Sequence, residues 1–196
     1  MNIVISIGEA LDRLSILEIK LCEFDDPQKR DCVQKEIDSL NGIIEYKSTF
    51  RYYYNLLYCV NKLIWDKTNV IKREPVGEVY ALIAKSIFDL NQSRFRVKNI
   101  INKQFSSGIQ EQKSYALTYV YIVIDTASDV DPDKLTFLSL NYDIVNIKCN
   151  ESVMSALHSI VPFNYTFDEI NCVRTNIKDI YIPSDYEIIT LKSVST

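Results

Sequence analysis

Apolar residues recur every three to four positions through roughly the first hundred residues, which is the period of an amphipathic helix. Ser6 and Glu9 form a capping box ahead of the first stretch, so we predict a helix over residues 7–24. Pro27 suits the first turn of a new helix. The same rhythm continues from there to about Ile71.

The stretch after Pro27 reads as one very long helix, or as two in series with an interruption around residues 47–51. Glu74-Pro75-Val76-Gly77 ends it, and a further helix is predicted over residues 76–105. Together these elements predict a long antiparallel helical hairpin or bundle, with a shorter helix packed against it.

Beyond residue 115 the hydrophobic period changes. Residues 117–124 form a β-branched and aromatic run that is typical of a buried strand. Strands are also expected at 143–149, 177–182 and 186–192, with helices at 132–141 and 151–161. Because strands and helices alternate, we predict a small α/β layer with a largely parallel sheet. The fold class is therefore α+β, with a helical domain over residues 1–115 and a small acidic α/β domain over residues 116–196.

The balance of charged residues also differs between these two predicted domains. The first 115 residues carry 17 Lys and Arg against 15 Asp and Glu, whereas the remainder carries 5 against 11. Nucleic acid is not expected as a partner, because no strongly basic surface is predicted. No apolar run reaches the roughly 18 to 20 residues of a membrane span, so no membrane association is expected.

Composition adds a hint of origin and compartment. Ile, Lys, Asn and Tyr are abundant and have A/T-rich codons, as in the genomes of some large DNA viruses. No signal peptide is evident, and five widely spaced cysteines read as reduced thiols. We therefore expect a cytoplasmic protein or, if it is viral, one in the host cytoplasm or the virion.

Four polar residues share one face of the predicted 76–105 helix: Asn91, Arg94, Lys98 and Asn102. The functional interpretation is an anion pocket, in which Arg94 and Lys98 hold a phosphate or a sugar acid. Lys113 follows closely and is a further candidate for this binding set.

The structural interpretation is an ion-pair network that fixes the register of packed helices. Glu9, Asp12 and Arg13 lie within one turn of the first helix, and Glu111 follows the later one. These acids nearly balance the nearby cations, and an anion pocket needs spare donors. We therefore favour the network and keep the pocket as the alternative.

Asp125, Asp129 and Asp131 follow the first predicted strand, where some sugar transferases bind a divalent metal and a nucleotide diphosphate. We expect no metal here, because Asp131 as the N-cap of a helix that begins at Pro132 explains the cluster. No cofactor is predicted either, since no glycine-rich phosphate loop is present. A nucleophilic Cys149 paired with the single His158 is disfavoured, and Tyr52, Tyr53, Tyr54 and Trp65 are expected to pack between helices.

Residues 7–20 (IGEALDRLSILEIK) resemble the opening of a family of uncharacterised, mainly bacterial proteins. Asn61 with Ile64-Trp65, the Asn91–Asn102 segment, and Glu111-Gln112-Lys113-Ser114-Tyr115 resemble further motifs of that family in the same order. The resemblance covers residues 3–115 and implies no established activity. Members of the family often occur beside, or fused to, glycosyltransferase and surface-polysaccharide proteins.

The leading functional hypothesis is a non-enzymatic interaction or assembly protein. Its helical hairpin would pack with a second copy to give a homodimer, and a different protein partner is possible. The alternative is a carbohydrate- or nucleotide-sugar-related enzyme or binding module that uses the Arg94 and Lys98 face or the aspartate cluster. Binding to nucleic acid is the weakest of the three.

Overall fold

The computed structural model describes residues 4–49, 51–104, 108, 118–159 and 187–191. The chain forms two compact units, residues 1–112 and 113–196, each with its own set of helices or strands. The expected domain boundary at residue 115 lies outside the described residues.

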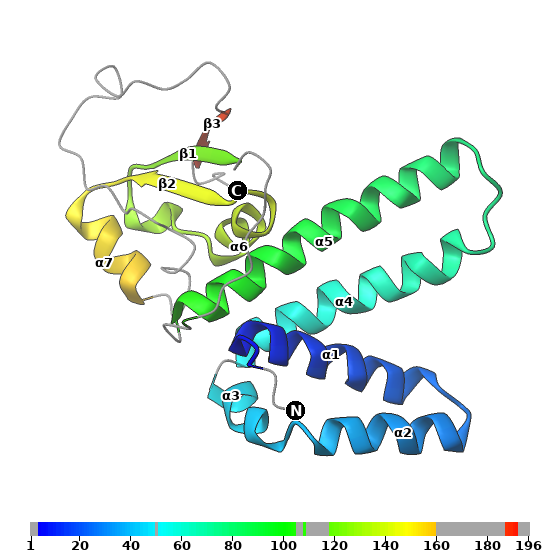
Figure 1. Cartoon of the computed structure of the whole chain (residues 1–196). Coiled ribbons are helices and arrows are strands. Elements are labelled where there is room, and N and C mark those ends of the chain that lie inside the picture. The colour runs from blue at the N-terminus through cyan, green and yellow to red at the C-terminus, as the bar shows by residue number, and fades with distance from the viewer. Residues whose placement is uncertain (1–3, 50, 105–107, 109–117, 160–186, 192–196) are drawn as a thin grey trace. The chain divides into compact units, whose positions relative to one another are not determined.

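The first unit begins with helix α1 (Ile7–Glu23), which confirms the predicted helix over residues 7–24. Its N-terminus is capped by the Ser6 hydroxyl, which accepts a hydrogen bond from the Glu9 N–H at 3.2 Å. Helix α2 (Pro27–Asp38) is capped by Asp26 and has Pro27 in its first turn. The two helices pack together as a hairpin (Figure 1).

The expectation of one long helix is wrong. The expected interruption around residues 47–51 is present, since one helix ends at Thr49 and the next begins at Arg51, but an earlier interruption was missed. The α-helical path stops at Asp38, and a short 3₁₀ helix η1 (Asn41–Ile43) and helix α3 (Ile44–Thr49) precede helix α4 (Arg51–Ile71). Ser39, Asn41 and Gly42 explain the earlier break, because these residue types favour turns over helix interiors.

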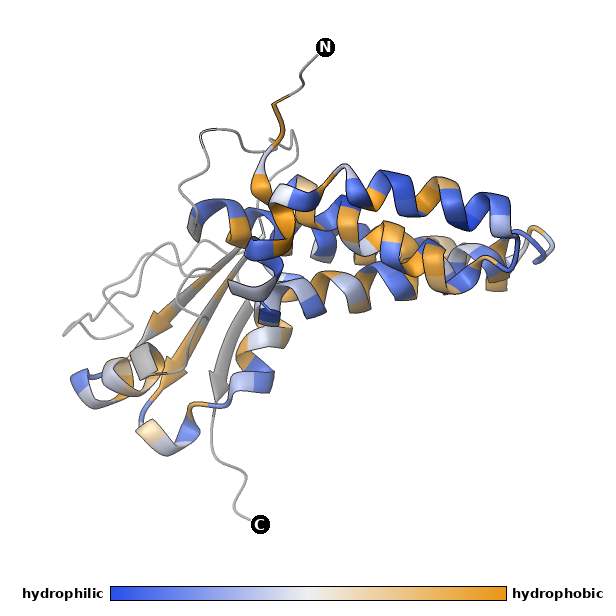
Figure 2. Cartoon of the chain, turned by 90° about the horizontal axis from the view of Figure 1, so that it is seen from below, coloured by the Kyte–Doolittle hydropathy of each residue, from blue (hydrophilic) through white to orange (hydrophobic). Residues whose placement is uncertain are grey.

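Helix α5 (Glu78–Gln104) returns along α4, so the unit contains two hairpins, α1–α2 and α4–α5, in place of the expected single one. Figure 1 shows the two hairpins meeting near the start of α1 and diverging toward their turns. Helix α1 packs against both α4 and α5. Figure 2 shows hydrophobic and hydrophilic positions alternating along these helices, as amphipathic packing requires.

The core of this unit lies where α1 crosses the inner parts of α4 and α5. Tyr53 and Tyr54 are buried there, whereas Tyr52 is exposed and stacks edge-on against Tyr53. The other large, fully buried apolar side chains of this unit are Leu11, Leu14, Leu17, Ile19, Leu57 and Ile101.

In the second unit, strands β1 (Tyr119–Ile124), β2 (Ile144–Lys148) and β3 (Glu187–Leu191) pair in the order β2-β1-β3. Both pairings are parallel, with Val120 opposite Val145 on one side and Glu187 on the other. A 3₁₀ turn η2 (Ala127–Asp129) and helix α6 (Pro132–Asn141) connect β1 to β2, and helix α7 (Glu151–Ser159) follows β2.

The apolar core of the second unit lies between the strands and these helices. Ile122 of β1 and Ile147 of β2 pack in one cluster with Leu135 of α6 and Leu157 of α7. The strand expected at 177–182 and the end of the helix expected at 161 lie outside the described residues. Within the part of the chain that the structure describes, no helix is both long and apolar enough to cross a bilayer.

Candidate functional site

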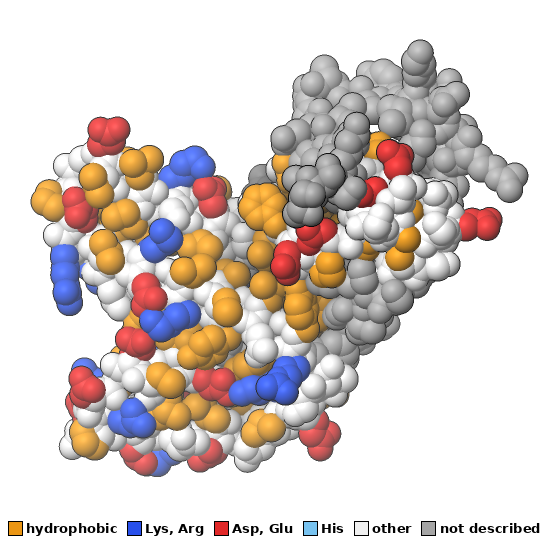
Figure 3. All heavy atoms as spheres, turned by 180° about the vertical axis from the view of Figure 1, so that it is seen from behind, with side chains coloured by type: hydrophobic (Ala, Val, Ile, Leu, Met, Phe, Trp, Pro, Cys, Tyr) orange, Lys and Arg blue, Asp and Glu red, His pale blue; other side chains and the backbone are white. Residues whose placement is uncertain are grey.

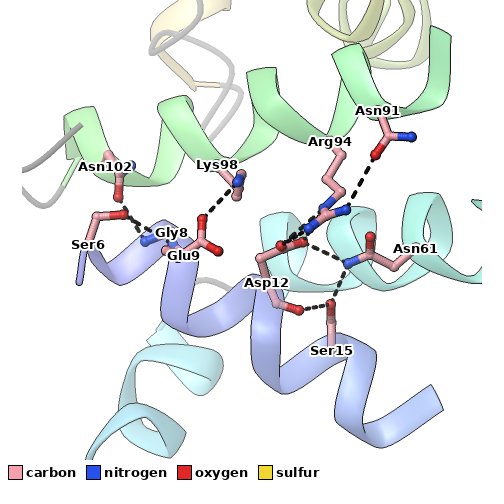
Figure 4. A network of polar contacts seen from close by, with 10 residues as sticks. All are labelled: Ser6, Gly8, Glu9, Asp12, Ser15, Asn61, Asn91, Arg94, Lys98 and Asn102. Atoms are coloured by element: carbon pink, nitrogen blue, oxygen red, sulfur yellow. Dashed lines mark hydrogen bonds and ion pairs between the residues drawn. The ribbon is translucent and has the colours of Figure 1, made fainter. Parts of the chain in front are cut away.

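The candidate site forms where the first turns of α1 meet α5 (Figure 4). Gly8 permits this close approach: a Cβ at this position would lie 2.5 Å from the Lys98 carbonyl oxygen. The Gly8 N–H donates to the side-chain oxygen of Asn102 at 2.8 Å, in a buried hydrogen bond. Asn102 therefore holds the start of α1 against α5.

One turn further along α1, Asp12 is the centre of a buried polar network. Only 1% of its side chain is exposed. Arg94 of α5 donates to it from Nε at 2.9 and 3.0 Å and from Nη2 at 2.7 Å. Such a two-pronged, charge-assisted contact is among the strongest that a buried carboxylate can make.

Asn61 brings α4 into the same network. Its side-chain nitrogen donates to Asp12 Oδ1 at 2.8 Å and to Ser15 Oγ at 2.7 Å, while the Ser15 hydroxyl donates to the Asp12 carbonyl at 2.7 Å. Figure 4 shows the Asn61 oxygen turned away from these partners. One carboxylate thus joins all three helices of the core.

A second ion pair lies nearer the surface. Lys98 Nζ of α5 is 2.8 Å from Glu9 Oε2, and the exposed fractions of the two side chains are 9% and 47%. The Glu9 backbone belongs to the α1 cap, and its carboxylate reaches across to α5. This pair is therefore half-open to water, unlike the pair at Asp12.

The predicted α5 face is thus brought to α1. Asn91 stays closest to its own helix: it donates to the Ile87 carbonyl at 2.9 Å, and its side-chain oxygen accepts a hydrogen bond from Arg94 Nη1 at 3.4 Å. Arg94, Lys98 and Asn102 have their partners on α1. Glu111 and Lys113 lie outside the described residues.

Arg13 does not join the Arg94 and Lys98 group that we expected it to accompany. It pairs with Glu36 of α2. The reason is geometric, because adjacent residues on a helix point about 100° apart, so Asp12 faces the core and Arg13 faces the neighbouring hairpin partner.

Two other network members, Ser15 and Asn61, were not predicted as site residues. A signal was present for Asn61, because it lies between Leu57 and Ile64 on the apolar stripe of α4. A polar residue on a buried face needs a hydrogen-bond partner. For Ser15 we find no comparable signal.

A surface pocket of about 330 Å³ lies over the ion pairs Asp12–Arg94 and Arg13–Glu36. Its charged lining is balanced, with three acids and three bases: Glu9, Asp12, Glu36, Arg13, Lys20 and Arg94. Balanced charges of this kind give an anion no net attraction. The arrangement is that of a network that fixes helix register.

Helix α3 is attached to the core through Lys47, whose Nζ lies 2.5 Å from Glu18 Oε1 and 4.6 Å from the centre of the Tyr54 ring. Burial, followed by the nearby Glu18 carboxylate, raises the pKa of the Tyr54 phenol far above its ordinary value. Tyr54 therefore stays protonated and serves as packing.

The aspartate cluster of the second unit has structural partners. Asp131 caps α6, as predicted, by accepting from the N–H groups of Asp133 at 3.0 Å and Lys134 at 3.2 Å, and these bonds lower its pKa. Asp129 accepts from the Thr126 hydroxyl at 2.7 Å. Among the residues that the structure describes, no three His, Cys, Asp or Glu side chains are grouped as metal ligands would be.

The described cysteines lie outside any disulfide: Cys149 is buried, and Cys22, Cys32 and Cys59 are exposed. The side chain of His158 lies outside the described part of the chain.

Neither a protein-family model, nor a curated protein, nor a solved structure matches this chain. The resemblance of residues 3–115 to a bacterial family therefore stays a prediction. Function is inferred from the surfaces of the molecule itself.

Proposed function

We propose that this protein is a non-enzymatic assembly protein, in which the outer part of the α4–α5 hairpin packs against the same part of a second copy. We call this part, residues 62–94, the arm. The observation that carries the proposal is the absence of any fully buried side chain along the arm.

Large apolar side chains are exposed on the arm. Leu63 and Val70 lie seven residues apart on α4 and so share one face of that helix. Val79 and Leu82 lie one turn apart on α5, and Val76 in the connecting turn is 90% exposed. Phe88 on α5 is exposed as well.

Two helices alone bury little apolar surface, so an isolated hairpin gains little stability in water. A second arm laid antiparallel against the first would make a four-helix arrangement, in which apolar faces of both copies are covered. Two lysines of the arm are paired on their own helices, Lys62 with Asp66 and Lys85 with Asp89, and so add no unpaired charge to the contact.

Sedimentation velocity over a range of concentrations tests the proposal. We expect a species of twice the 22.7 kDa chain mass. Leu82→Glu should shift it to the monomer, because a charge would be buried in the contact. Phe137→Glu is the matched control: Phe137 on α6 is as exposed as Leu82, at 63% against 62%, but lies outside the arm.

A wild-type protein that stays monomeric at every concentration would refute the proposal. So would a dimer that Leu82→Glu leaves intact while its helical circular dichroism is unchanged.

We also infer that the second unit is the small acidic α/β domain that its sequence predicts. The parallel pairing of β1 with β2 and β3 supports this, as does the apolar cluster that joins the strands to α6 and α7. No role in assembly is assigned to it.

A further inference from the structure

A pocket of about 180 Å³ lies between α1 and α4, with one residue of α5 at its side. The two hairpins diverge along these parts of α1 and α4 (Figure 1), and the space-filling view shows a notch between the hairpins (Figure 3). Ile16 and Ile19 of α1 form one side, and Ile64 and Trp65 of α4 form the other. Pockets for drug-sized ligands span roughly 300–1,000 Å³. The occupant of this one must therefore be small, with an apolar body.

The charges around this pocket differ from those of the pocket over the ion pairs. Its lining holds two cations, Lys72 and Arg94, and no carboxylate. Arg94 is already held by Asp12, whereas the exposed Lys72 ammonium has no carboxylate partner among the described residues. The pocket thus combines apolar walls with one available positive charge, that of Lys72.

Trp65 supplies ring surface to this pocket. Its indole nitrogen is buried and has no hydrogen-bond partner, so an occupant meets the carbon atoms of the indole instead of this nitrogen.

We propose that this pocket binds a small organic carboxylate with a ring-sized apolar body. The body lies between the three isoleucines and Trp65, and the carboxylate pairs with Lys72. This inference is independent of the arm contact. Leu63 and Val70 lie on one face of α4, and the pocket residues Trp65, Thr68 and Lys72 lie on roughly the opposite face.

The test uses Trp65 itself, because it is the only tryptophan of the chain. 3-Phenylpropionate is titrated into the full-length protein while Trp65 fluorescence is followed. We expect a saturable change, with affinity at least about fivefold higher than for 3-phenylpropan-1-ol, which has the same body without the charge. Inorganic phosphate, an anion without the body, should give no saturable change.

Lys72→Ala should weaken 3-phenylpropionate binding on the order of fivefold and leave the alcohol unaffected, since it removes only one partly exposed ion pair. Lys85→Ala is the matched control, because Lys85 is an exposed lysine on α5 that does not line the pocket. Thr68→Phe, which fills the pocket, should abolish binding of both compounds.

Equal affinities for the acid and the alcohol would overturn the proposal, as would a Lys72→Ala protein that binds the acid like wild type. Saturation by phosphate alone would overturn it in favour of a plain anion site. Leu82→Glu separates the two proposals: a monomer that still binds 3-phenylpropionate supports the pocket whatever becomes of the dimer.

Discussion

Asp12 shows how much one residue can decide in this protein. Its carboxylate accepts hydrogen bonds from α4 and α5 while its own backbone belongs to α1. In a low-dielectric interior each of these contacts is strong, and an unpaired group left behind is costly. The network therefore makes the packing of these three helices depend on a single side chain.

We expect Asp12→Ala to lower the free energy of unfolding by about 3 kcal/mol. This is the lower end of the range for breaking a buried pair, because 26% of the Arg94 side chain is exposed and water can partly replace the lost partner. Urea denaturation followed by helical circular dichroism measures the change.

Asp89→Ala serves as the control, since it removes the carboxylate of the exposed Lys85–Asp89 pair on α5. Exposed pairs four residues apart on a helix contribute only about 0.3–0.5 kcal/mol. Equal effects of the two substitutions would show that the buried network contributes no special stability.

Sequence predicted the members of this network better than their pairing. The spacing of Arg94 and Lys98 places them on one helical face, and two acids were expected opposite them. Arg13 pairs with Glu36 only because α2 packs beside α1. Asn61 reaches Asp12 only because α4 packs against the same helix. Periodicity within one helix contains no such information.

At the scale of elements, helix ends were predictable where a side chain caps them. Ser6 and Asp131 lie one residue before helices whose bounds match the predictions closely. Such caps are local hydrogen bonds, so the sequence contains them in full. The turn after Asp38 was missed, because the apolar rhythm continues through it.

Gly8 determines how closely α1 approaches α5. We expect Gly8→Ala to destabilise the protein by about 1–3 kcal/mol, the usual cost of overpacking. The added methyl group would meet a backbone carbonyl at 2.5 Å and the Asn102 oxygen at 2.8 Å, and the carbonyl cannot move aside like a flexible side chain. Thermal and urea unfolding of the variant test this.

Gly42→Ala is the matched control, because a Cβ at Gly42 meets nothing within 4 Å. Its stability should be unchanged or raised by up to about 1 kcal/mol, since alanine restricts the unfolded chain. If Gly8→Ala proved as well tolerated, the close approach of α1 and α5 would not be the reason for a glycine at this position.

At the scale of the whole molecule, the two compact units have separate cores. Leu57 is fully buried among helices of the first unit, and Ile122 is buried in the cluster that joins β1 to α6 and α7. Separate cores are expected to unfold as separate cooperative units.

We therefore expect two calorimetric transitions. Leu57→Ala should lower one of them and Ile122→Ala the other, each through a loss of about 2–5 kcal/mol from the core concerned. A single transition that both substitutions lower equally would mean that the units fold as one body.

The sequence by itself determined the properties that depend on neighbours along the chain: the helical period of the first hundred residues, the caps at Ser6 and Asp131, and the polar face of α5. The tertiary structure alone decided that there are two hairpins, that Arg94 pairs with Asp12, and that apolar walls from α1 and α4 enclose a pocket near Lys72. The physical reason is that these contacts join residues far apart in sequence, and their geometry exists only once the turn after Asp38 has set the direction of α4.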